Sequence, residues 1–186
     1  MSKIDHALAF HCGPAMVGLK PANLISLSRA QYPDLEALIQ EYDCRFRGKG
    51  VRFRQLCECS RGVLLLVYHS RKLEEQLGLP EVAELLQKDG YPVDKGLERM
   101  LLFLGKRLIA ADNFPHEIGL FLGYPVEDVL GFQRYGGRNC KFCGHWKVYS
   151  DVERARALFR QYDRCREVLC SRLAEGMTLG EILQAA

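Results

Sequence analysis

A histidine and a cysteine stand side by side near the N-terminus, in the run His11-Cys12-Gly13-Pro14-Ala15-Met16. A thiolate is both a nucleophile and a soft metal ligand, and the free backbone N–H groups of a helix N-terminus favour it. We therefore expect Cys12 to lie at the mouth of a helix, with His11 as a neighbouring base. The alternative is a buried packing cysteine beside a structural histidine.

A second group of candidate residues lies in Cys140-Lys141-Phe142-Cys143-Gly144-His145. Two cysteines at this spacing can bind one zinc or iron ion, or form a redox-active dithiol. A structural zinc site needs two more ligands, and the chain has no second Cys-x-x-Cys motif. We take Cys140, Cys143 and His145 as candidate metal ligands, with chance spacing as the alternative.

Two further pairs of polar residues have types that suit a site. His116 and Glu117 fall in the first turn of a predicted helix, where the helix dipole would favour the carboxylate and a neutral imidazole. Lys20 and Asn23 would supply a cation and an amide to an anionic ligand near Cys12. The structural alternatives are a carboxylate that complements a helix end and a solvated lysine.

Two other functions remain open from the residues. The string Cys-Gly-Pro-Ala at Cys12 resembles the nucleophile turn of papain-like cysteine peptidases, with His145 as partner. No glutamine precedes Cys12 for an oxyanion hole, and no further strand follows to orient the histidine. Residues 117–134 imitate a helix-turn-helix, although Glu127 and Asp128 would repel phosphate in its second helix. A helical hairpin is favoured, and a non-catalytic adaptor or regulator stays an alternative.

The elements that must position these residues are few strands and many helices. A strand is predicted at Asn23–Ser28, and the alternation of Val51–Cys57 with the apolar run Val63–Tyr68 indicates a hairpin whose second strand is central. Trp146–Tyr149 is typical of one more strand. We predict an α+β fold, with a small mixed or antiparallel sheet of about four strands packed by many helices.

The longest helix is predicted to begin at a capping box, Ser150-Asp151-Val152-Glu153. Its buried face would carry these residues: Val152, Ala155, Leu158, Phe159, Tyr162, Cys165 and Leu169. A second capping box at Thr178–Glu181 predicts a short final helix. The arginines of the long helix do not fall on one stripe and indicate a solvated surface.

Length and composition indicate the number of domains, the excluded classes of partner and the cellular location. At 186 residues and 48% hydrophobic content, we predict one domain over residues 1–186. A net charge of +3 is too small to indicate nucleic acid or a membrane, and no apolar run would span a bilayer. The charged start lacks a signal peptide, so we predict a cytoplasmic protein whose eight cysteines are free thiols.

Three separated motifs follow in order along the chain: His11-Cys12 with Leu19–Leu24, Phe114–Gly119 with Phe121–Pro125, and Cys143-Gly144 with Trp146–Tyr149. Together they resemble the domain of unknown function 3793 family, which occurs mainly in Clostridia and other anaerobic bacteria. The resemblance implies an anaerobic, cytoplasmic setting near flavodoxin or iron-related functions. Flavodoxin or another redox protein is therefore a candidate partner, and Trp146 and Lys147 are motif positions.

We combine these observations into one predicted site, formed where the three motif segments converge. The expected chemistry is thiol-centred redox or metal-linked, with zinc or iron as candidate cofactors. The predicted catalytic residues are His11, Cys12, Lys20, His116 and Glu117. The predicted binding residues are Asn23, Trp146 and Lys147.

Overall fold

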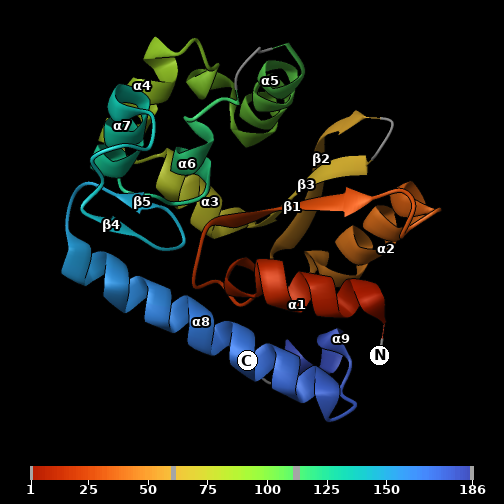
Figure 1. Cartoon of the computed structure of the whole chain (residues 1–186). Coiled ribbons are helices and arrows are strands. Elements are labelled where there is room, and N and C mark those ends of the chain that lie inside the picture. The colour runs from red at the N-terminus through yellow and green to blue at the C-terminus, as the bar shows by residue number, and fades with distance from the viewer. Residues whose placement is uncertain (1, 60–61, 111–113, 185–186) are drawn as a thin grey trace.

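The computed structural model describes residues 2–59, 62–110 and 114–184, and it confirms an α+β fold (Figure 1). The elements follow in the order α1 (Lys3–Met16), β1 (Ala22–Ser28), α2 (Leu35–Arg47), β2 (Val51–Cys59), β3 (Gly62–His69), α3 (Ser70–Leu77), α4 (Pro80–Lys88), a 3-10 turn (Val93–Lys95), α5 (Leu97–Ala110), α6 (Ile118–Phe121), α7 (Val126–Tyr135), β4 (Phe142–Cys143), β5 (Lys147–Val148), α8 (Val152–Ala174) and α9 (Leu179–Ile182). No helix in these described ranges is long and apolar enough to cross a membrane.

The main sheet has the strand order β1-β3-β2, and both pairings are antiparallel. The predicted hairpin is thus confirmed, with its apolar second strand in the centre. The expected fourth strand lies elsewhere, because β5 pairs only with β4 in a separate two-stranded hairpin. The sheet of about four strands is therefore three strands plus this small hairpin.

Successive residues along a strand of the sheet face opposite sides, and each side packs against a different hydrophobic core. Val63, Leu65 and Val67 of β3 pack with α1, α2, α8 and α9. Leu66 and Tyr68 of the same strand pack with helices α3 to α7. Both faces of the sheet are therefore covered, as Figure 1 shows, and this explains why the sequence of β3 is apolar throughout.

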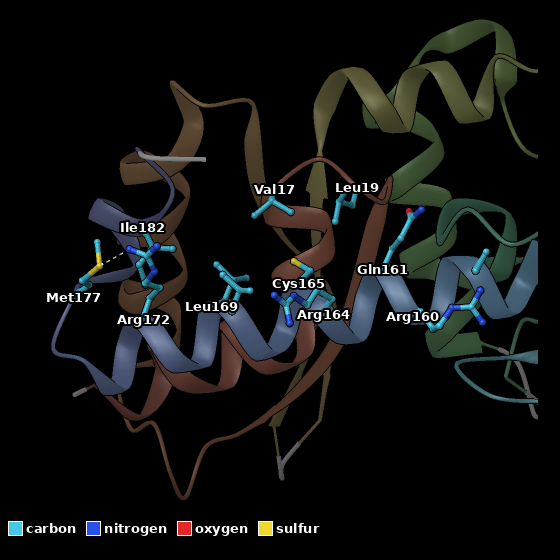
Figure 2. Close-up of a pocket in the computed structure, with 12 residues that line it drawn as sticks. Val17, Leu19, Arg160, Gln161, Arg164, Cys165, Leu169, Arg172, Met177 and Ile182 are labelled. Carbon is cyan, nitrogen blue, oxygen red and sulfur yellow. Dashed lines mark hydrogen bonds between the residues drawn. The ribbon is translucent and has the colours of Figure 1, made fainter.

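Helices α1 and α8 run side by side under the sheet (Figure 1), and a glycine permits their close approach. A Cβ atom on Gly13 would lie 2.5 Å from Leu169 Cδ1 of α8. The chain leaves α1 through Gly18, whose φ of +73° suits glycine. The Pro14 carbonyl then accepts the N–H groups of Leu19 and Lys20. Figure 2 shows this loop, with Leu19, passing over α8.

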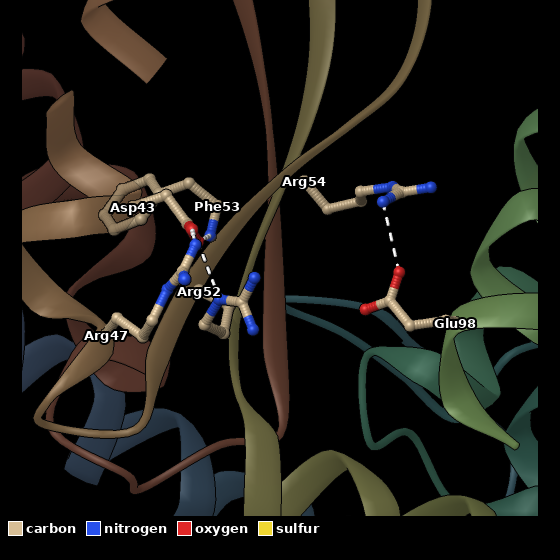
Figure 3. A network of polar contacts seen from close by, with 6 residues as sticks. All are labelled: Asp43, Arg47, Arg52, Phe53, Arg54 and Glu98. Carbon is tan, nitrogen blue, oxygen red and sulfur yellow. Dashed lines mark hydrogen bonds and ion pairs between the residues drawn. The ribbon is translucent and has the colours of Figure 1, made fainter. Parts of the chain in front are cut away.

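A buried carboxylate joins α2 to the sheet (Figure 3). Asp43 accepts hydrogen bonds from three donors: Arg47 Nη2, Arg52 Nε and the backbone N–H of Phe53. Burial alone would raise the pKa of Asp43, but these hydrogen bonds hold it below its ordinary value. Two residues after Arg52 along β2, Arg54 pairs with Glu98 of α5 at 3.1 Å. Both helices are thereby anchored to one strand.

The helix ends agree with the sequence in one case and differ in another. Thr178 and Glu181 form the predicted capping box of α9. At α8 the cap is Asp151, whose side chain accepts the Arg154 N–H, and not Ser150. The difference is one residue, because Ser and Asp are both strong N-cap residues and stand next to each other here.

Candidate functional site

One cavity gathers several of the predicted site residues. It has a volume of about 380 Å³ and lies between the end of α1, the start of β1, the turn after α6, the β4–β5 hairpin and α8. We call it the Lys20 pocket, and it is lined by Phe10, His11, Pro14, Lys20, Asn23, Leu24, Leu122, Tyr124, His145, Tyr162 and Arg166.

Lys20 is the central charge of this pocket. The residue is only 5% exposed, and its ammonium group has no hydrogen-bond or ion-pair partner among the described residues. It rests between two tyrosine rings, 5.1 Å from the centre of Tyr124 and 5.7 Å from that of Tyr162. Burial lowers the pKa of Lys20 to about 8, against a weaker opposing effect of Cys12. At pH 7 the charged form therefore still predominates.

The other buried charged groups of the described chain all have partners. Asp5 accepts the Tyr42 hydroxyl at 2.5 Å, while Asp43, Glu117 and Asp128 each have two or more hydrogen-bond or ion-pair donors. A buried charge without a partner costs folding free energy. Such a group is characteristic of a site that is completed by a ligand.

Arg166 of α8 brings a second cation to the pocket. Its Nη2 lies 2.9 Å from Asp163 Oδ1 and 3.3 Å from His145 Nε2. His145 Nε2 also lies 3.0 Å from the same Asp163 oxygen. The guanidinium group stacks on the Phe10 ring at 5.0 Å. These contacts fix the direction of Arg166 and leave further N–H groups for a ligand.

Two histidines flank this arginine, and both are biased toward the neutral form. Burial lowers the pKa of His11, and Arg166 lowers it further. Burial also lowers the pKa of His145, although Asp163 partly opposes this effect. Neutral imidazoles at pH 7 can donate one hydrogen bond and accept another. The positive charge of the pocket therefore comes from Lys20 and Arg166.

The wall of the pocket is held by a stack of aromatic rings. Tyr124 stacks on Trp146 with ring centres 4.7 Å apart, and Trp146 meets Phe159 edge-on at 4.4 Å. The indole N–H of Trp146 donates to Asp128 at 2.7 Å. Trp146, which we predicted as a binding residue, is buried behind the wall and positions Tyr124 instead.

Cys12 does not have the position that we expected. It lies in the interior of α1, far from that helix's N-terminus, and its residue is fully buried. Burial raises its pKa well above that of a free thiol, and nearby Lys20 opposes this only weakly. Cys12 is therefore a neutral packing thiol behind the pocket, and the papain-like reading, which needs a reactive thiolate, is not supported by this geometry.

The His116-Glu117 segment does not join the pocket, so the predicted convergence of three segments is wrong in this part. His116 is exposed and meets the Phe132 ring edge-on at 4.8 Å. Glu117 is buried, accepts the Tyr91 hydroxyl at 3.0 Å and pairs with Arg107 at 2.6 Å. These two residues connect α6 to its neighbours. The same motif reaches the pocket through its other end, at Leu122 and Tyr124.

The Cys-x-x-Cys motif lies on the β4–β5 hairpin. The described residues contain no group of three or more His, Cys, Asp or Glu that would hold a metal ion, so the ligand set Cys140, Cys143 and His145 is not found. His145 turns away to Asp163 and the pocket. Cys143 is exposed, and the ammonium group of Lys147 hydrogen-bonds to it.

The helix-turn-helix alternative fails on the position of Asp128. Helices α6 and α7 do form a helical hairpin, but Asp128 in the first turn of α7 is buried. Besides the Trp146 indole, it accepts the backbone N–H groups of Tyr149 and Ser150 at 2.7 and 2.8 Å. The start of α7 is thus covered by the β4–β5 hairpin and does not face a groove of DNA.

Tyr124, Tyr162 and Arg166 are among the lining residues that the sequence did not identify as part of the site. Its patterns predict Tyr162 on the buried face of the long helix and Arg166 on its solvated surface. The signal was present in the helical spacing, because Arg166 follows Tyr162 by four residues and precedes Leu169 by three. An arginine on an otherwise apolar stripe indicates a buried polar site.

The comparisons with known proteins give one match. The sequence model of a family described as a protein of unknown function (DUF3793) matches residues 8–183. No curated protein and no solved structure matches the chain. The matched range includes every element that lines the Lys20 pocket.

Proposed function

The chain belongs to the DUF3793 family, and we propose that it binds a small organic anion, a carboxylate or a phosphate, in the Lys20 pocket. The observation that carries this proposal is the buried ammonium group of Lys20, which faces a cavity and has no partner among the described residues. An anion in the cavity would supply the missing opposite charge.

The groups around Lys20 fit the same class of ligand. The side-chain oxygen of Asn23 accepts the Ala15 N–H at 3.1 Å, which directs the use of its amide nitrogen as a donor. Arg166 adds donors that match the geometry of a carboxylate or phosphate. Leu24, Leu122 and the Tyr124 ring offer apolar walls. A ligand with an anionic head and a small apolar or aromatic body satisfies both halves of the pocket.

The test uses matched charged and neutral probes. The thermal unfolding midpoint is measured with benzoate and phenyl phosphate, and with benzamide as the neutral analogue. We expect at least one anion to raise the midpoint of the wild type and benzamide to have no effect. The Lys20→Met variant should lose this response. Lys106→Met removes an exposed lysine of α5 and should retain it. An equal response in Lys20→Met, or no response to any anion, contradicts the proposal.

A second candidate function is thiol redox chemistry at Cys143, supported by the contact with Lys147. The hydrogen bond to Cys143, with a weaker attraction from Cys140, raises the pKa of Lys147. A neighbouring ammonium group is one of the environments in which protein thiols react. In the proposed step the two thiols lose two electrons and two protons as their disulfide forms, and an acceptor disulfide becomes two thiols.

Alkylation kinetics test this second candidate. Iodoacetamide should modify Cys143 rapidly, and buried Cys12 serves as the slow internal reference. Lys147→Met should slow the modification of Cys143 and leave Cys12 unchanged. Oxidised glutathione should convert the Cys140–Cys143 pair to a disulfide, which mass spectrometry detects as the loss of two hydrogens. An equal alkylation rate in Lys147→Met, or no oxidation of the pair, would argue against a redox role.

The wider setting stays a set of predictions. Metal-linked chemistry with zinc or iron has no ligand cluster to support it among the described residues. A flavodoxin or another redox protein is the partner expected if the thiol pair is redox-active. A single domain over residues 1–186 and a cytoplasmic location are likewise expectations from the sequence.

A further inference from the structure

A second hollow also borders the loop that carries Lys20. Leu19 precedes Lys20 in this loop and faces an open groove of about 870 Å³ along α8 and α9 (Figure 2). We call this the α8–α9 groove. Its lining shares no residue with the Lys20 pocket, so a role for this groove is independent of the proposed function.

The floor of the α8–α9 groove is apolar and accessible. It is formed by Val17, Leu19, Val168, Leu169 and Ile182. Leu19 is 48% exposed and Val168 is 42% exposed, although both are large apolar residues. Apolar side chains gathered in a concave surface are typical of a contact that excludes water when it is occupied.

The rim of the groove is positively charged. Arg160, Arg164 and Arg172 line it, and none of them forms an ion pair within the described chain. Arg172 has only a contact of 3.8 Å to the Met177 sulfur. Arg160 and Arg164 are four residues apart on α8, a spacing at which like charges repel. Carboxylates of a partner would relieve this repulsion.

The length and shape of the groove also suit the binding of a helix. Its α8 residues run from Ala157 to Arg172, which corresponds to about 22 Å of helix. The residues Ala157, Gln161, Arg164 and Val168 follow at intervals of four, three and four, so they lie along one side of α8. The backbone of α8 is hydrogen-bonded within the helix, so the groove offers no strand edge to an extended peptide.

We propose that the α8–α9 groove binds an acidic amphipathic helix of a partner protein. The apolar face of that helix would cover Leu19 and Val168. Its flanking carboxylates would pair with Arg160, Arg164 and Arg172. The charge complementarity selects an acidic helix over a neutral or basic one.

The test uses designed peptide probes with the full chain. One fluorescent probe of 18 residues carries leucines at helical spacing and flanking glutamates, and a second carries lysines in place of the glutamates. A third keeps the composition of the first but scrambles its spacing. We expect the wild type to bind the glutamate helix and neither of the other two.

Charge reversal at the rim should exchange this preference. Arg160→Glu/Arg164→Glu should weaken binding of the glutamate helix by about tenfold or more and create binding of the lysine helix. The matched control is Arg99→Glu/Lys106→Glu, which makes the same change in net charge at exposed positions of α5. This control should bind as the wild type does.

Each other outcome overturns the proposal. Failure of the wild type to bind the glutamate helix, or an equal loss in the α5 control, would exclude specific helix recognition by the rim. Flotation with phosphatidylglycerol vesicles that is lost in the rim variant would assign the groove to a membrane surface. A concentration-dependent dimer that dissociates in the rim variant would assign it to a second copy of this chain.

Discussion

Asp128 and Lys20 are both buried charges, and they lie at the two ends of one series of contacts. Asp128 receives three donors, from the Trp146 indole and from two backbone N–H groups. The Trp146 ring stacks on Tyr124, and the Tyr124 ring faces the ammonium group of Lys20. Lys20 has no hydrogen-bond or ion-pair partner in the described chain. The satisfied charge of Asp128 holds the wall of the pocket in place, and the unsatisfied charge of Lys20 is the one that an anionic ligand would neutralise.

This contrast predicts that the two charges have opposite effects on stability. Replacing a satisfied buried charge leaves its donors without partners, which destabilises the folded state. Replacing an unsatisfied one with an apolar side chain of similar volume removes a desolvation cost. Four variants, with decreasing expected effects on the free energy of unfolding, test this difference between Asp128 and Lys20.

Asp128→Ala should have the largest effect. We expect it to lower the free energy of unfolding by roughly 3–5 kcal/mol, because a buried indole N–H and two backbone N–H groups lose their acceptor. Urea unfolding measures the change. Glu127→Ala, the exposed neighbour on α7, is the control and should differ little from the wild type. A change below about 0.5 kcal/mol in Asp128→Ala would contradict the view that Asp128 stabilises the wall of the pocket.

Lys20→Met should raise the free energy of unfolding of the ligand-free protein by about 3 kcal/mol at pH 7. The reason is that folding lowers the pKa of Lys20 from 10.5 to about 8. Between these two pH values the unfolded chain binds the additional proton at Lys20, so the contribution of this residue to stability rises with pH. The stability advantage of Lys20→Met over the wild type should therefore shrink from pH 8 to pH 10.5, whereas the difference between Lys106→Met and the wild type should stay constant. A destabilised Lys20→Met would mean that the lysine is structural.

Asn23→Ala should lower the free energy of unfolding by about 1–2 kcal/mol. Its side-chain oxygen accepts the N–H of Ala15, which is fully buried, and the variant removes this hydrogen bond between β1 and α1. Ser26→Ala, at an exposed position of the same strand, is the matched control in chemical denaturation. An effect equal to that of the control would mean that the hydrogen bond from Ala15 to Asn23 adds nothing to the stability of the folded state.

Arg164→Ala should change the free energy of unfolding by less than about 0.5 kcal/mol. Its side chain is exposed on the rim of the α8–α9 groove and has no ion-pair partner in the described chain. The same thermal or urea measurement checks this value. A larger loss would show that the rim arginines stabilise α8 itself and would weaken the case that they serve a partner.

The sequence predicted the elements better than the site. The apolar run Val63–Tyr68 identified the central strand because a strand with both faces covered has no polar alternation. The Thr178–Glu181 capping box identified α9, since its residues satisfy one another locally. These features depend on neighbours along the chain, which a single sequence contains.

The errors arose where long-range packing decides. We expected Cys12 to lie at the mouth of a helix, but it lies inside α1 and is enclosed against α8. A motif also does not say which of its ends faces a site. His116 and Glu117 connect helices, and the pocket receives Tyr124 from the same motif. His11, Lys20 and Asn23 were found because they lie close together in the sequence, and His145 because it follows the Cys-x-x-Cys motif. Arg166 could be found only from the packing of α8.

The central claim is that Lys20 is a buried, unpaired cation that an anionic ligand completes. The most direct test is an NMR titration of the Lys20 ε-carbon, alone and with benzoate or phenyl phosphate. The account predicts a pKa of about 8 in the free protein, and a higher pKa with a bound anion, because an opposite charge favours the ammonium form. A pKa near the ordinary 10.5 that neither anion changes would contradict the account.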